Sequence, residues 1–331
     1  MTWLTDPLSA SFVLRALLGG VLVAAICGVV GTWVVLRGMA FLGEAMAHGM
    51  LPGVALAALL GLPVVVGAAV SALVMSVGVG VVERRAKIGA DTAIGLLFVG
   101  MLSLGVVIVS RSRTFATDVT SILFGDVLAI STSDLLLMTG ALVLVVLVAA
   151  VLHRPFVALA FDERLASTLG LRPRLARVAL VGLVTIAVVA SYGAVGSLLV
   201  VALLLAPAVA AGHWVRRVPS TMLLATAFGS LAALVGLLVS WHAGTAAGAS
   251  IAGVAVALVP LSAVVRRLVS AVAVRPGATP PPGEAPSAPV GPSTSAPVGT
   301  PTSAPVGTPT SAPVGTPTRP KGLRAPERPL V

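Results

Sequence analysis

Long apolar segments recur along most of the chain, and they constrain its fold more than any other feature. A bilayer-spanning helix needs about 20 predominantly apolar residues. Segments near that length lie at about 12–36, 44–60, 62–82, 92–110, 134–152, 174–191, 193–211, 219–240 and 249–268. Backbone polar groups in lipid must be satisfied within the spanning structure, so we expect helices. The sequence predicts an all-α polytopic membrane protein with about nine (eight to ten) transmembrane helices in a domain of residues 1–270.

Composition supports a membrane protein and argues against nucleic acid as a partner. The chain is 57% hydrophobic and only 10% charged, which is outside the range of soluble globular proteins. A net charge of +10 would suggest nucleic-acid binding in a soluble domain, but here the arginines occupy short connectors between apolar segments. That distribution is typical of residues that orient helices in a lipid bilayer.

Basic residues are concentrated in alternate connectors between the predicted spans. Alternation places on one side Arg37, Arg84–Lys87, residues 154–177, Arg216–Arg217 and Arg266–Arg267. Connectors rich in Lys and Arg stay in the cytoplasm. We therefore expect an external N-terminus and a cytoplasmic C-terminus.

The composition changes completely near residue 271. From there Pro, Gly, Ser and Thr dominate, and Ser-Ala-Pro-Val-Gly begins at positions 287, 295, 303 and 311. Proline at this density forbids a packed core. We interpret residues 271–331 as a disordered repeat tail, which serves as a spacer or, alternatively, as a docking segment for a proline-binding domain.

Glu44 and His48 place two metal-ligand side chains between apolar segments. Four residues apart, they share one face of a helix and can reach one cation together. Their oxygen and nitrogen atoms suit a divalent first-row metal ion. A charged carboxylate near the bilayer centre costs about 2.5–3.5 kcal/mol on insertion scales, so it normally faces a cavity or a partner. The alternative is a cytoplasmic turn in which Glu44 is solvated and His48 is packed.

Residues 161–171 form the most polar part of the one substantial connector, and their pattern predicts a short amphipathic helix. Phe161, Leu165 and Leu169 form an apolar stripe along this helix. Asp162 and Glu163 lie beside the stripe, and Gly170 stops the helix. Such a helix docks in a groove on a soluble partner. Alternatively, it lies against the bilayer surface.

The sequence lacks the motif that would let it hydrolyse ATP itself. No Gly-x-x-x-x-Gly-Lys-Ser/Thr occurs, so any ATP-driven step requires another subunit. We therefore expect a transport subunit and not an enzyme. An ion-coupled secondary transporter of a small solute is the alternative, because such proteins also carry ionisable residues near the midplane.

In order and spacing, five segments resemble the permease subunit of the metal-type (ABC-3) ABC importers, which carry zinc, manganese or iron(II) into bacteria. The resemblance covers nearly the whole membrane portion and excludes the tail. The matching segments are 37–53, 91–105, 123–128, 161–171 and 196–211.

The resemblance implies an assembly and a location. The expected partners are a second permease copy, cytoplasmic ABC ATPases that bind the ATP and an extracytoplasmic metal-binding protein. The divalent metal is the transported substrate, and this chain holds no cofactor of its own. The assembly is expected in the bacterial plasma membrane.

The resemblance also implies roles for particular residues. Glu44 and His48 fall on the translocation path, although the acidic position is more often Asp. Residues 161–171 become the coupling helix that sits on the ATPase. The connector 240–248 lacks the acidic residue often found there, which leaves His242 as its only candidate ligand.

Overall fold

A computed structural model of the protein describes residues 11–111, 125–161 and 173–273, and in these ranges it contains helices and turns but no strand. Eight helices there are long and apolar enough to cross a membrane. This confirms the prediction of an all-α polytopic protein with eight to ten spans. The tail lies outside the described residues, and its boundary near residue 270 lies at their edge. Both stay predictions.

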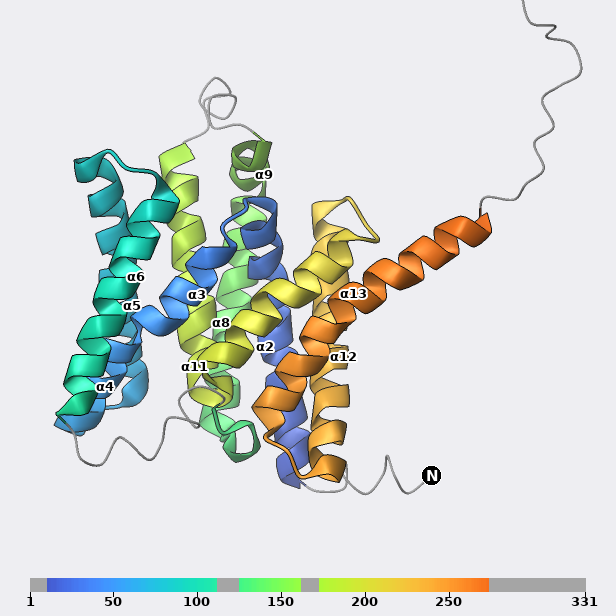
Figure 1. The fold of residues 1–331 in the computed structure, drawn as a ribbon, viewed down its shortest axis with the longest axis horizontal. Coiled ribbons are helices and arrows are strands. Elements are labelled where there is room, and N and C mark those ends of the chain that lie inside the picture. The colour runs from blue at the N-terminus through green and yellow to red at the C-terminus, as the bar shows by residue number, and fades with distance from the viewer. Residues whose placement is uncertain (1–10, 112–124, 162–172, 274–331) are drawn as a thin grey trace, which may run out of the picture. The chain divides into compact units, whose positions relative to one another are not determined.

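The elements follow one another with short connectors (Figure 1). In chain order they are α2 (Ser11–Leu36), α3 (Ala40–Gly49), α4 (Leu51–Leu60), α5 (Val64–Ala86), α6 (Ala90–Ser110), the 3-10 turn η2 (Val127–Ala129), α8 (Thr132–Val151), α9 (His153–Phe161), α11 (Pro173–Gly212), α12 (Val218–Ala243) and α13 (Ala247–Ala273). Helices α3 and α4 together make one span, Ala40–Leu60.

Helix α11 combines the two spans expected at 174–191 and 193–211. It breaks at Gly196, whose φ of 73° and ψ of 171° belong to a region open essentially to glycine alone. In Figure 1 the two halves of α11 run in different directions. Pro207, in contrast, lies in the second half without a break in the helical dihedrals.

Helix α2 forms the centre of the packed part, where it contacts α8, α11 and α12. Its glycines permit close approach: a Cβ atom on Gly31 would overlap the carbonyl of Leu204 on α11, and one on Gly28 would lie 2.5 Å from Oγ1 of Thr226 on α12. Association of helices in a membrane depends on such close packing, since lipid tails are as apolar as leucine.

The connectors predicted to be cytoplasmic lie together. Figure 1 places the α2–α3, α5–α6 and α11–α12 connectors and α9 at one end of the helices. The α4–α5 and α12–α13 connectors and the start of α2 lie at the other end. The connectors that the basic residues predicted to share one side therefore do lie at one end of the helices. The assignment of this end to the cytoplasm stays a prediction.

Candidate functional site

Helix α3 carries Glu44 and His48, and a glycine turn sets its direction. Gly38, with φ of 66°, ends α2: its N–H donates to Val35 O at 3.1 Å, and Met39 N–H donates to Val34 O at 3.0 Å. This pattern is a Schellman C-terminus, which favours glycine at the left-handed position. The chain then enters α3, which packs against α5, α6 and α11.

The span that begins with α3 is interrupted at Met50, two residues after His48. Pro52 has no N–H to donate to the His48 carbonyl four residues earlier. Met50 N–H donates to this carbonyl instead, and the Ser71 hydroxyl on α5 donates to the Gly49 carbonyl at 2.8 Å. Pro52 thus separates α3 from α4, while Met50 N–H and the Ser71 hydroxyl keep the carbonyls of His48 and Gly49 hydrogen-bonded.

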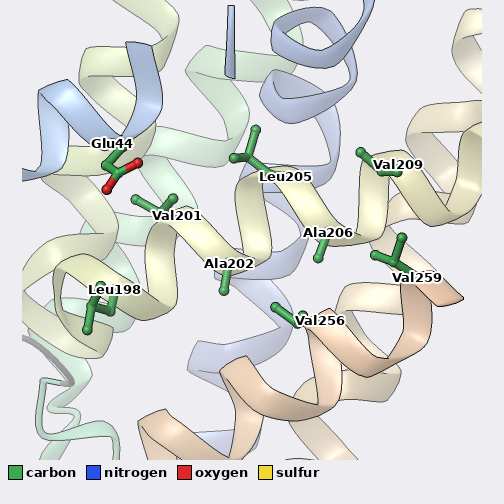
Figure 2. A pocket seen from close by; sticks show the side chains of 9 residues that line it. All are labelled: Glu44, Leu198, Val201, Ala202, Leu205, Ala206, Val209, Val256 and Val259. Atoms are coloured by element: carbon green, nitrogen blue, oxygen red, sulfur yellow. The ribbon is translucent and has the colours of Figure 1, made fainter. Parts of the chain in front are cut away.

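Glu44 is exposed and lines an open groove of 390 Å³ (Figure 2). Apolar side chains of α13 and of the second half of α11 form the remaining lining: Leu198, Val201, Ala202, Leu205, Ala206, Val209, Val256 and Val259. Among these described lining residues Glu44 alone carries a charge. The groove therefore presents one carboxylate, an anionic ligand for a cation, on an otherwise apolar surface.

His48 lies on the same helix but has different neighbours. It is half-buried, and its ring centroid is 5.9 Å from that of Phe98 on α6, with the rings inclined at 65°. Phe98 in turn meets Phe41 at 5.5 Å. The imidazole thus packs beside an aromatic pair and is not among the residues that line the Glu44 groove. Joint binding of one cation by Glu44 and His48 stays a prediction.

The third candidate ligand lies elsewhere. His242 is an exposed residue in the last turn of α12, and its Nδ1 lies 2.8 Å from Leu238 O. The α12–α13 connector that follows it is at the end opposite α9 in Figure 1. Within the ranges that the structure describes, no three His, Cys, Asp or Glu side chains come together as a metal cluster. The fold does not bring His242 into the groove.

The predicted ATPase-coupling residues fall almost entirely outside the description. Phe161 ends α9, whereas Asp162, Glu163, Leu165, Leu169 and Gly170 lie outside the described residues. Their role stays a prediction.

Sequence reasoning missed the apolar wall of the groove. The α11 residues of this wall follow the three- and four-residue spacing of one helix face. That stripe is visible in the sequence, but it consists of the same residue types as a lipid-facing stripe. Only its position beside Glu44 distinguishes it.

Comparison with known proteins links this arrangement to a family of transporters. Residues 9–266 match the model of the ABC 3 transport family. The manganese transport system membrane protein MntC of Halalkalibacterium halodurans is 36% identical over 263 residues, which cover 79% of this chain and 90% of the relative. The manganese import system permease protein ScaB of Streptococcus parasanguinis is 35% identical over 240 residues, covering 72% and 85%.

A solved structure shares the fold. A chain of PsaBC from Streptococcus pneumoniae, determined in complex with a Fab, superposes with a TM-score of 0.70 at 31% sequence identity. The match covers 78% of this chain and 94% of that one. The likeness thus extends over most of this chain and nearly all of that one.

Proposed function

Because this chain belongs to the ABC 3 transport family, we propose that it is the membrane-spanning permease subunit of an ATP-driven importer of divalent metal ions. Relatives named as manganese and iron transport proteins make these two ions the first substrates to test, with zinc third. The chain supplies the translocation path, and a partner ATPase supplies the energy. ATP binding is assigned to that partner because the sequence has no P-loop motif.

The observation that carries the proposal is the exposed Glu44 in an apolar groove within a membrane span. A carboxylate in this position is costly against lipid and is normally found facing a cavity or a protein partner. We assign the groove to the path of the ion. In this proposal a second permease copy packs over the groove. A two-fold symmetric interface of this kind would bring two Glu44 carboxylates to one path.

The ligands favour passage over storage of the ion. One carboxylate and one imidazole per subunit fall short of the four ligands of a closed structural site. Oxygen and nitrogen donors suit manganese and iron as well as zinc. We propose that the ion contacts Glu44 and His48 transiently, with His242 a weaker candidate for contact at the opposite end.

The remaining partners follow from the same proposal. Residues 161–171 contact the ATPase, and an extracytoplasmic protein delivers the ion to the other end of the helices. The basic connectors that lie beside α9 support placing this end, and with it the tail, in the cytoplasm.

The test is metal uptake by the Glu44→Gln variant. In a bacterial host that lacks its own manganese importer, the unmodified chain, expressed with its ATPase and binding protein, should restore cell-associated manganese measured by elemental mass spectrometry. Glu44→Gln removes the charge at nearly constant volume, and we expect uptake to fall by about a hundredfold, the upper end of the losses seen when a group that supports a metal ion is replaced.

The matched control is Asp134→Asn, which neutralises a carboxylate that caps α8 through Ser131 N at 3.0 Å and does not line the groove. This variant should keep its uptake. Equal uptake by Glu44→Gln and the unmodified chain would exclude Glu44 from the path. Uptake that survives ATP depletion and collapses with a proton uncoupler would favour the secondary-transporter alternative.

A further inference from the structure

Two side-chain contacts hold the chain on either side of residues 162–172. The described part of α9 stops at Phe161, just before this segment, and that of α11 starts at Pro173, just after it. Arg37, which directly follows α2, contacts α9. Glu83, near the end of α5, contacts Arg177 of α11. Both contacts lie toward the same end of the helices, the end where α9 is labelled in Figure 1.

The contact on α9 combines an aromatic cluster with a charged hydrogen bond. The Trp33 ring is fully buried and makes edge contacts with the rings of His153 and Phe156, at centroid distances of 5.6 and 5.2 Å. The Arg37 guanidinium donates through Nη1 to the carbonyl oxygen of Leu159. Arg37 thus links the α2–α3 turn to α9.

The contact on α11 is an ion pair. Arg177 Nη1 lies 2.7 Å from Glu83 Oε1, and the two side chains are 32% and 25% exposed. Glu83 lies in the last turn of α5, and α5 packs along both α3 and α11. The pair therefore joins the start of α11 to the helix that supports α3.

Each contact involves a part of the chain that continues into a wall of the Glu44 groove. Arg37 is followed by the Gly38 turn and then by α3, which carries Glu44. Helix α11 continues past Gly196 to the opposite wall, which begins with Leu198. The two flanks of residues 162–172 are therefore connected to the two walls of the groove, one through Arg37 and the α2–α3 turn and the other through α11.

We propose that Arg37 and the Glu83–Arg177 pair are positioning residues that transmit movement of α9 and of the start of α11 to Glu44. The inference rests on the proposed function, in which an ATPase drives the movement. Trp33 and Phe156 keep α9 seated while Arg37 transmits the displacement to the α2–α3 turn. Loss of these contacts uncouples ATP hydrolysis from metal movement without removing any group from the path.

The experiment uses the full chain assembled with its ATPase and binding protein in liposomes, with Mn²⁺ as the probe. ATP hydrolysis and radioactive manganese uptake are measured on the same preparation, and their ratio is the readout. For Arg37→Met we expect hydrolysis to stay within about twofold while uptake falls by about tenfold, within the range of known coupling contacts. Arg37→Lys, which keeps a charged hydrogen-bond donor for the Leu159 carbonyl, should restore most of the ratio.

Two further variants separate coupling from folding. Arg154→Met removes an exposed cation from the same helix α9 and should leave uptake and hydrolysis unchanged. Glu83→Arg should lower the ratio, and adding Arg177→Glu should restore it by reforming the pair in reverse. A merely structural role would lower uptake and hydrolysis by the same factor.

Each outcome decides the proposal. A ratio that is unchanged in Arg37→Met and Glu83→Arg, or that falls equally in Arg154→Met, overturns the transmission role while the importer function stands. An unmodified assembly that shows no ATP-dependent manganese uptake overturns the proposed function and this inference with it. A lowered ratio with rescue by Arg37→Lys and by the charge swap supports it.

Discussion

Gly125→Ala tests whether the break in α11 depends on a close backbone contact. Gly125 has φ of 64°, and a Cβ atom built on it would lie 2.5 Å from Gly196 N and 2.5 Å from Val195 C. The left-handed backbone alone costs alanine about 1–2 kcal/mol. Overlap with backbone atoms adds about 1–3 kcal/mol, because overpacked sites relax only by shifting the chain.

Together these two costs lower the free energy of unfolding by about 2–5 kcal/mol. For a domain of this size each kcal/mol lowers Tm by about 2–4 °C. Gly125→Ala should therefore lower the Tm of the purified, detergent-solubilised protein by about 4–20 °C. Because the shifted backbone carries the second half of α11, manganese uptake should fall as well.

Gly61→Ala is the matched control for this prediction. Gly61 also has a left-handed backbone, with φ of 67°, but no atom lies within 4 Å of its would-be Cβ. It should therefore show the backbone cost alone, a Tm decrease of about 2–8 °C, and normal uptake. If the two variants melt at the same temperature, the Gly125–Gly196 contact does not hold the break, and the reasoning fails.

Two other predictions concern the segments outside the described residues. Replacing Leu165 and Leu169 by Asp should release the ATPase in a detergent pull-down, because the docking stripe becomes charged, and retained ATPase would argue against docking there. Truncation after Arg275 should leave manganese uptake near normal, since the repeat tail cannot form a packed core; a large loss of uptake would show that the tail recruits a needed partner.

Several features of the fold could be predicted because they depend on local chemistry. Segment length and hydropathy located the spans, and the break between 191 and 193 was placed close to Gly196. The distribution of Arg37, Arg84 and Arg216 predicted which connectors share an end. The four-residue spacing of Glu44 and His48 places them on one face if the segment is helical, and both residues do lie on α3.

Other features could not be predicted because they depend on which distant residues meet. The Arg37 contact with the Leu159 carbonyl joins positions 122 residues apart. Likewise, His48 packs against Phe98 while Glu44 faces Val201 and its neighbours, although spacing treats Glu44 and His48 alike.

The sequence alone determined the membrane class, the spans and the order of their connectors, because hydrophobicity and charge act residue by residue on transfer into a bilayer. Only the tertiary structure decided which apolar stripes face lipid and which face the groove. Lipid and protein interior are equally apolar, so no pattern in Leu198, Val201 or Val256 distinguishes the two environments. Helix α11 changes direction at Gly196, which lies against Gly125, and this direction makes the stripe a wall beside Glu44.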